Sequence, residues 1–212
     1  MWLHDQIADA VADAFEHESQ HLDDEQSVYG LDALDEKRLH PLIQHGLLLE
    51  GFGVWAEQAY PSQRQGPAHA ARRCDLVLTP TDQAPLENPN QEPTLFSPPE
   101  TTPPEQAFWL EVKTTSQNTV EGPNRRYESD LRTAAVADLV KLRSDPLIFH
   151  AGLLLILFTE TRADAERDLQ RWLRLVHESG HPVGGPAVRG MDLPQRSGHG
   201  HMAFGLFPIR RG

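Results

Sequence analysis

The stretch AFWLEVKTTS, residues 107–116, has the apolar character of a core strand, but it carries two opposite charges. Successive side chains of a strand point to opposite faces, so Glu111 and Lys113 share one face. On a solvent-exposed face two such residues would form an ordinary ion pair. Among residues suited to a core, they indicate a functional site if further polar groups lie beside them.

The preceding strand pattern supplies such a group. RRCDLVLTP, residues 72–80, is typical of a strand that ends at Pro80, and Asp75 stands beside its apolar run. Sequential strands commonly pair, so we expect Asp75, Glu111 and Lys113 to converge at one edge of a sheet. Two carboxylates with few neutralising partners suit Mg²⁺ or Mn²⁺, and a nearby ammonium group can orient a water or help to deprotonate it. The alternative is an edge-strand Asp75 that faces solvent.

The remaining apolar periodicity predicts an α/β fold in which helices flank a mixed sheet. Helices are expected at 2–18, 35–49, 126–143 and 161–180, and strands at 53–61, 72–80, 107–115, 151–159 and 201–209. The first two strands should form an antiparallel hairpin. The strand at 151–159 is apolar on both faces, which indicates a position inside the sheet. Residues 181–199, rich in Gly and Pro, are expected to be a loop.

Length and composition fit one globular domain. The chain has 212 residues, of which 39% are hydrophobic and 24% charged. Residues 80–106 hold eight of the 17 prolines, so this segment is expected to be a long, poorly ordered loop. There is one cysteine, so no disulfide framework is expected within the chain.

Negative charge is concentrated in two segments. Residues 1–50 hold twelve acidic and two basic residues, a balance of −10, and residues 79–106 hold five acidic residues and no Lys or Arg. Because the total is −12, the rest of the chain has a balance of about +3. This distribution argues against a protein that coats nucleic acid non-specifically. The acidic N-terminal segment instead suggests a surface for a protein partner.

The location is expected to be cytoplasmic, without a membrane partner. The first twenty residues contain acids where a signal peptide needs a basic end and an apolar run. The longest apolar run, AGLLLILF at 151–158, is too short to span a bilayer.

The pair of motifs CDLVL and WLEVKTTS resembles the PD-(D/E)xK nuclease superfamily, which has the restriction-endonuclease-like fold. The resemblance covers residues 35–160. It implies one nuclease-like domain in which 1–34 is a helical extension, 80–106 a flexible insertion and 161–212 a C-terminal helix and strand. Cys74 stands where the family usually has Pro, and the insertion is longer than the family's hairpin turn.

The resemblance also implies roles for single residues. Asp75 and Glu111 would bind Mg²⁺ or Mn²⁺ together with the backbone carbonyl of Val112, and Lys113 would serve the attacking water. A further acid is expected, and both Glu36 and Glu57 fit its place. Polar residues of the following helix often face the site in related sequences. Gln117, Asp138 and Lys141 are the candidates here by analogy.

The function implied is Mg²⁺-dependent hydrolysis of phosphodiester bonds in DNA by an endonuclease, with RNA as an open alternative. Arg125, Arg126 and Lys141 would contact phosphates, and a homodimer would allow both strands of a duplex to be cut. The rival hypothesis is a catalytically silent nuclease-like module that binds protein or nucleic acid. His199 and His201 could bind zinc with a third ligand, but no motif such as HExxH supports this.

Overall fold

Six strands form one mixed sheet in the order β1–β2–β3–β6–β8–β7 in the computed structural model, which describes residues 2–63, 72–87, 100–119, 121–181, 183–194 and 198–210. The strands are β1 Gly53–Ala59, β2 Arg73–Thr79, β3 Phe108–Ser116, β6 His150–Thr159, β7 Ala187–Asp192 and β8 His201–Pro208. Only β3 and β6 pair in parallel; the other neighbours are antiparallel. The predicted α/β class, the mixed sheet and the first hairpin are therefore confirmed.

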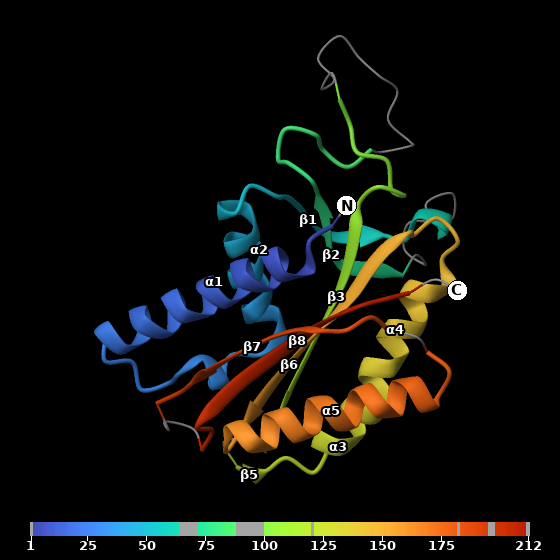
Figure 1. The fold of residues 1–212 in the computed structure, drawn as a ribbon. Coiled ribbons are helices and arrows are strands. Elements are labelled where there is room, and N and C mark those ends of the chain that lie inside the picture. The colour runs from blue at the N-terminus through green and yellow to red at the C-terminus, as the bar shows by residue number, and fades with distance from the viewer. Residues whose placement is uncertain are drawn as a thin grey trace.

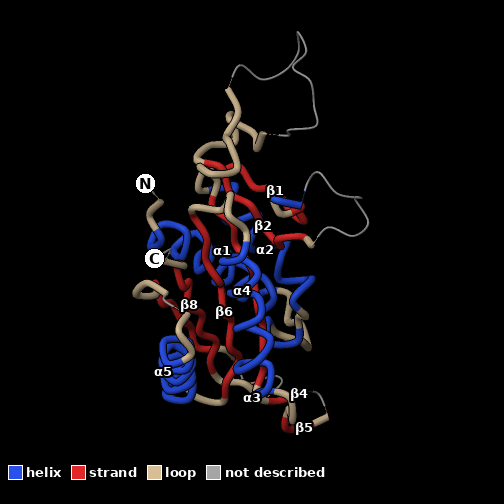
Figure 2. The backbone as a smooth tube through the Cα atoms, turned by 90° about the vertical axis from the view of Figure 1, so that its right-hand side faces the viewer, coloured by secondary structure: helices blue, strands red, loops and turns tan. Residues whose placement is uncertain are grey.

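Helices cover both faces of this sheet (Figure 1). One face carries α1 and α2, and the other carries α4 and α5. The helices are α1 His4–Asp24, α2 Glu36–Leu49, α3 Tyr127–Ser129, α4 Ala135–Ser144 and α5 Arg162–Glu178. Two short 3₁₀ turns, Leu31–Ala33 and Pro61–Gln63, complete the helical elements, together with a π-helical turn, η3 (Asp130–Ala134), which joins α3 to α4. Figure 2 shows the strands as a twisted layer through the middle of the molecule.

Strand β6 explains why two helical layers are needed. Leu154 and Ile156 pack into the core beneath α1 and α2, whereas Leu153 and Leu155 pack beneath α4 and α5. All four are fully buried. A strand that is apolar on both faces is stable only when both faces are covered, as the sequence of 151–159 predicted.

The N-terminal helix is a layer of the main core. Ile7, Val11 and Phe15 of α1 are fully buried in the same apolar cluster as α2 and the sheet. On its polar side, Asp9 accepts a hydrogen bond from Arg189 Nε of β7 at 2.6 Å. The acidic helix thus lies on the face opposite α4 and α5, and it continues to Asp24, beyond the expected end.

Two local expectations differ from the structure, and one element was not expected. Strand β7 lies in the segment 181–199, so the prediction of a loop there was wrong; this edge strand buries few residues and includes a glycine, which hides the strand pattern. The helix expected at 126–143 is interrupted by η3. A two-stranded hairpin, β4 Asn118–Thr119 and β5 Gly122–Pro123, lies beside α3 (Figure 2).

The proline-rich insertion is described only at its ends. Leu86 and Thr102 form a parallel bridge there, and residues 88–99, the middle part of the expected flexible loop, lie outside the described residues. Residues 64–71 of the connection between the first two strands also lie outside them. Within the described part of the chain, no helix has the length and apolar character needed to cross a membrane.

Candidate active site

The site begins where β2 stops pairing with β3. The ladder between them covers Phe108 to Leu110 and ends at the pair Leu76–Leu110, so Asp75 stands at the register position opposite Glu111. Asp75 Oδ2 accepts a hydrogen bond of 2.8 Å from the backbone N–H of Val112. A carboxylate therefore takes the place of the missing strand neighbour. The two motif strands meet despite the long insertion, as the sequence predicted.

The next free N–H group of β3 is bound by Glu36. Asp35 caps helix α2 by accepting from Arg38 N at 2.9 Å, which places Glu36 at the first turn, beside the sheet edge. Glu36 Oε2 accepts from Thr114 N at 2.9 Å and from Lys113 Nζ at 3.1 Å. The acid of the second helix thus holds the lysine of the motif.

The other candidate acid, Glu57, is directed elsewhere. Its register position lies opposite Asp75, between the pairs Ala56–Leu76 and Gln58–Cys74, but it forms no ladder pair. Its φ of 53° is unusual for a residue with a side chain. Its side chain is exposed and forms no hydrogen bond or ion pair in the described ranges. Of the two acids left open by the sequence, the structure brings Glu36 to Lys113.

Glu111 is the most deeply buried acid of the site, with 2% of its surface exposed. The hydroxyl of Tyr60 donates a hydrogen bond to Glu111 Oε1. Burial, and next the negative charge of Asp75, raise the pKa of Glu111 to about 9, whereas the hydrogen bond from Tyr60 and the charge of Lys141 lower it. At pH 7 this carboxyl group is therefore protonated, because burial and the neighbouring carboxylate of Asp75 both favour its neutral form.

Two lysines supply the positive charge around this pair. Burial lowers the pKa of Lys113, but the carboxylates of Glu36, Asp138 and Asp75 together raise it more, so the net pKa is above the ordinary value. The same balance holds for Lys141 of α4, whose Nζ lies 2.5 Å from Asp138 Oδ1. Both groups therefore stay charged at neutral pH, which suits them to electrostatic stabilisation and not to proton abstraction.

Other polar residues considered from the sequence lie away from the carboxyl pair. Arg125 and Arg126 are exposed and precede α3, beyond the far end of β3. Gln117 Oε1 accepts from Glu160 N at 2.9 Å, which ties it to the end of β6.

The two histidines weighed for zinc have separate partners. His199 Nδ1 lies 3.0 Å from Asp32 Oδ2, and His201 Nδ1 lies 2.9 Å from Asp192 Oδ1. Because each imidazole is bound to a different carboxylate, the described geometry gives a shared zinc ion no support.

Tyr60 was missed by sequence analysis. It follows β1 directly and contacts Glu111 across 51 positions of sequence. Its only signal was its place at the end of an expected strand before Pro61, and such a tyrosine is ordinarily part of a core.

The oxygen atoms at this edge suit a hard divalent cation. Asp75 and Glu111 contribute carboxylates, and the Val112 carbonyl points to the same open edge as its N–H group. A cation between the carboxylates would remove the charge repulsion that contributes to the raised pKa of Glu111. In the described ranges there is no group of three or more His, Cys, Asp or Glu side chains arranged to hold a metal ion. The donor set is thus two side chains and one backbone oxygen.

Comparisons with protein families, with curated proteins and with solved structures found no match to this chain.

Proposed function

We propose that this chain is a metal-dependent nuclease of the restriction-endonuclease-like class that hydrolyses phosphodiester bonds in DNA. The observation that supports this most is the carboxyl pair of half-buried Asp75 and buried Glu111 beside a charged lysine, at the open edge of β3. A carboxyl group with a strongly perturbed pKa beside a specific charged partner is characteristic of functional sites. The mixed sheet and the order of its elements agree with this class.

Asp75, Glu111 and the Val112 carbonyl would hold Mg²⁺ or Mn²⁺, which would supply Lewis-acid polarisation of the phosphoryl oxygen and a more acidic bound water. The protein's own contacts fix the donors for that task. The N–H of Val112 orients Asp75, and the hydroxyl of Tyr60 orients Glu111.

The lysines act through charge. Lys113, held by Glu36, would stabilise negative charge that develops on the phosphate and would orient the attacking water. The charge of Lys141 on α4 favours the ionised carboxylate of Glu111. Because Glu36 holds the ammonium group of Lys113 by an ion pair, loss of Glu36 would weaken the orientation of this group.

The test is Mg²⁺-dependent cleavage of plasmid and linear DNA by the wild type and by single variants. Asp75→Asn, Glu111→Gln and Lys113→Ala should each lower the rate at least about 100-fold, the range for loss of a catalytic group. Glu36→Gln should have a smaller effect, since it removes only the partner of Lys113. Glu57→Gln is the matched control, because this acid is exposed, and its rate should equal that of the wild type.

Robust cleavage by the Asp75, Glu111 and Lys113 variants would contradict the site assignment. The same assay with single-stranded RNA decides between the two nucleic acids. Cleavage of RNA alone would mean that the substrate is RNA and not DNA. The assignment of the site residues would then be unchanged.

One observation favours a second candidate, a catalytically silent nuclease-like binding module. Both contacts of Glu36 are with β3, so this acid does not extend the pair Asp75–Glu111 to a third carboxylate ligand. Calorimetric titration with Mn²⁺ separates the two functions. Binding that disappears in Asp75→Asn supports the nuclease, whereas the absence of such binding favours the silent module.

A further inference from the structure

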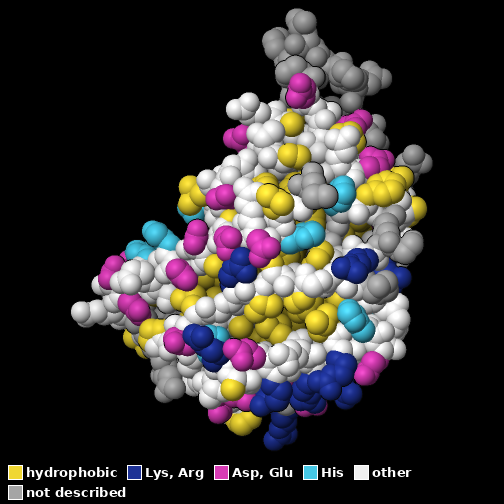
Figure 3. All heavy atoms as spheres, viewed as in Figure 1, with side chains coloured by type: hydrophobic (Ala, Val, Ile, Leu, Met, Phe, Trp, Pro, Cys, Tyr) yellow, Lys and Arg dark blue, Asp and Glu magenta, His cyan; other side chains and the backbone are white. Residues whose placement is uncertain are grey.

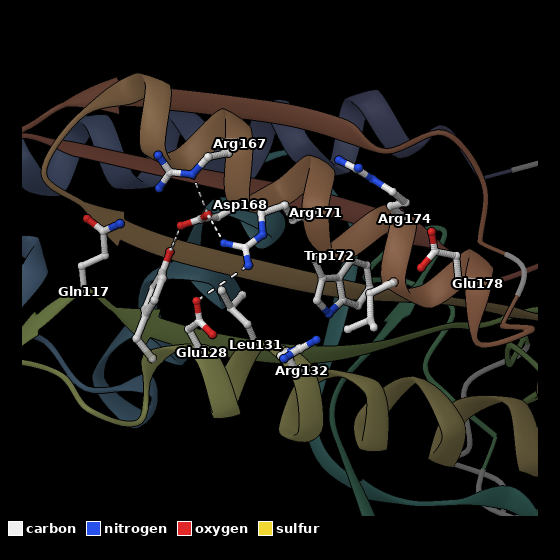
Figure 4. A pocket seen from close by; sticks show the side chains of 12 residues that line it. Gln117, Glu128, Leu131, Arg132, Arg167, Asp168, Arg171, Trp172, Arg174 and Glu178 are labelled. Atoms are coloured by element: carbon white, nitrogen blue, oxygen red, sulfur yellow. Dashed lines mark hydrogen bonds and ion pairs between the residues drawn. The ribbon is translucent and has the colours of Figure 1, made fainter.

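A second site lies on the other side of α4, between the segment α3–η3 and helix α5. It is a cavity of about 350 Å³ (Figure 4). Its lining comes from both helices and includes Tyr127, Leu131, Arg132, Trp172 and Arg174. Neither Asp75, Glu111, Lys113 nor Glu36 contributes to it. The cavity is therefore separate from the carboxyl pair and needs its own explanation.

Positive charge gathers around this cavity, although the whole chain is acidic. Four of its lining residues are arginines: Arg132, Arg167, Arg171 and Arg174. Figure 3 shows Lys and Arg side chains clustered over the region of α5. Three acids, Glu128, Asp168 and Glu178, also line the cavity, so its net charge is +1.

The arginines divide into two kinds. Arg167 and Arg171 are bound to the buried Asp168, with N–O distances of 3.2 and 3.7 Å. Arg132 and Arg174 form no ion pair or side-chain hydrogen bond with any described residue. A guanidinium group has five donors in a planar arrangement that matches a phosphate or carboxylate group. Two arginines at this cavity thus keep their donors available for an anion.

A third donor without a partner belongs to Trp172. Its side chain is buried, with 2% of its surface exposed, and its Nε1 has no hydrogen-bond partner in the described structure. Figure 4 shows the indole nitrogen on the edge of the ring turned toward Arg132. Buried N–H groups are nearly always paired, because an unpaired one is energetically costly. The indole N–H therefore indicates a ligand atom that accepts a hydrogen bond.

The rest of the lining is apolar or aromatic, apart from Gln117. Leu131, Leu175 and Tyr127 form walls next to the donors. Small-molecule sites combine apolar walls with a few convergent polar groups, and this volume lies near the lower end of their range of roughly 300–1,000 Å³. The lining thus suits an organic anion and not a bare inorganic ion.

We propose that this cavity binds an organic phosphate of the size of a nucleoside monophosphate. Arg132 binds the phosphate group and Trp172 Nε1 donates to one of its oxygens, whereas Leu131, Leu175 and Arg174, which Figure 4 shows on the opposite side of Trp172 from Arg132, contact the organic part. Phosphate is the preferred anion because its several acceptor oxygens match both a guanidinium group and the indole N–H. This assignment does not depend on the nuclease site.

Isothermal titration calorimetry of the full chain tests the proposal, with adenosine monophosphate, inorganic phosphate and adenosine as probes. The buffer contains EDTA, so that no metal at Asp75 and Glu111 attracts phosphate. Adenosine monophosphate should bind saturably, inorganic phosphate more weakly and adenosine more weakly still. Arg132→Ala should weaken binding of the monophosphate at least about tenfold, as expected for loss of a charged hydrogen bond. Arg174→Ala should weaken it less, because Arg174 contacts only the organic part.

Arg162→Ala is the matched control, because Arg162 is an exposed arginine of α5 outside the cavity. Its affinity should equal that of the wild type. Absence of saturable binding of adenosine monophosphate, or wild-type affinity in Arg132→Ala, would overturn the proposal. Binding of a single-stranded oligonucleotide that depends on Arg132 and Arg174, without binding of the monophosphate, would overturn it in favour of a strand-binding surface. Asp75→Asn should bind adenosine monophosphate normally, so this result stands apart from the outcome of the cleavage assay.

Discussion

Two buried tyrosine–carboxyl pairs lie on the α4–α5 side of the sheet and have opposite surroundings. Tyr60 donates to Glu111, and Tyr127 donates to Asp168 at 2.9 Å. The two acids are equally inaccessible, with 2% and 3% of their surfaces exposed. Both pairs have the same type of hydrogen bond, from a tyrosine hydroxyl to a carboxyl oxygen, but the charges around them differ.

Asp168 is surrounded by cations. Arg167 and Arg171 both approach its Oδ1, and the charge of its carboxylate, after burial itself, raises the pKa of Tyr127. Glu111 instead lies beside a second acid, Asp75, and its own pKa is raised. A buried carboxylate stabilises a fold only when it is paired. The first pair therefore serves as a structural link between α3 and α5, whereas in the second pair Glu111 keeps a proton, which a bound cation would replace.

The largest effect is expected from Asp168→Ala. This change removes the acceptor of Tyr127 and the shared partner of Arg167 and Arg171. The free energy of unfolding should fall by about 3 kcal/mol, within the range for breaking a buried charged network, because the arginines can still turn to solvent. Urea denaturation at pH 7 measures it. Glu166→Ala, an exposed acid of the same helix, should change stability by less than about 0.5 kcal/mol, and an equal loss in both variants would contradict the structural role of Asp168.

Glu111→Gln should raise the free energy of unfolding, whereas Asp168→Ala lowers it. The folded protein keeps a proton on Glu111 up to a pKa of about 9, whereas the unfolded chain loses it near 4.5, so the wild type loses stability as the pH rises between these values. Glutamine has no such proton and can still accept from Tyr60. At pH 8 the variant should be more stable than the wild type, on the order of 2 kcal/mol.

At pH 4 the two proteins should have nearly equal stability, because Glu111 is then protonated in both states. Urea denaturation at several pH values measures the difference. The difference in stability between the variant and the wild type is compared at the two pH values. If the variant is the less stable protein at pH 8, Glu111 is ionised in the fold and its charge is satisfied by its partners.

Metal binding should release a proton at the Glu111 pair. Because Glu111 is protonated at neutral pH, a cation that binds its carboxylate displaces close to one proton at pH 7. Mn²⁺ titration by calorimetry in two buffers with different ionisation enthalpies gives this number. Affinity should fall as the pH is lowered. Binding without proton release, or the same release in Glu111→Gln, would place the metal elsewhere.

The smallest effects are expected from removing the phenolic hydroxyls. Tyr127→Phe and Tyr60→Phe should each lower the free energy of unfolding by about 1 kcal/mol, the net value of one hydrogen bond. Only Tyr60→Phe should also move the pH profile of DNA cleavage to higher pH, because the hydroxyl of Tyr60 lowers the pKa of Glu111. A shift of equal size in Tyr127→Phe would show that the profile reports general stability.

Sequence reasoning brought Asp75 and Glu111 to one edge of the sheet because only short-range rules were needed. Strand alternation fixes a face, and sequential strands tend to pair, so the insertion between them did not matter. The choice between Glu36 and Glu57 required the direction of α2 relative to β3 and the left-handed backbone at Glu57, and neither is encoded in a local pattern.

The rest of the candidate site comes from tertiary packing. Tyr60 reaches Glu111 only because the end of β1 folds against the α4 side of the sheet, and Lys141 approaches Glu111 only because α4 covers β3. In the sequence both residues resemble ordinary core or surface positions. Strand β7 was missed for another reason: an edge strand with alternating shallow burial lacks the apolar density of a buried strand.

The π-helical turn η3 changes the direction in which side chains point along the helical segment from α3 to α4. The residues before it and the residues after it therefore contact different neighbours. A π turn contains one residue more than an α turn, so it rotates the part before it relative to the part after it. Tyr127 and Arg132 thereby face α5, while Asp138 and Lys141 face the Glu111 side. Deleting one residue within Asp130–Ala134 would restore a regular helix and turn its two halves about 100° relative to each other. The extra residue of the π turn thus sets the rotation between the two halves of the segment. Both the anion cavity and the surroundings of the carboxyl pair depend on that rotation.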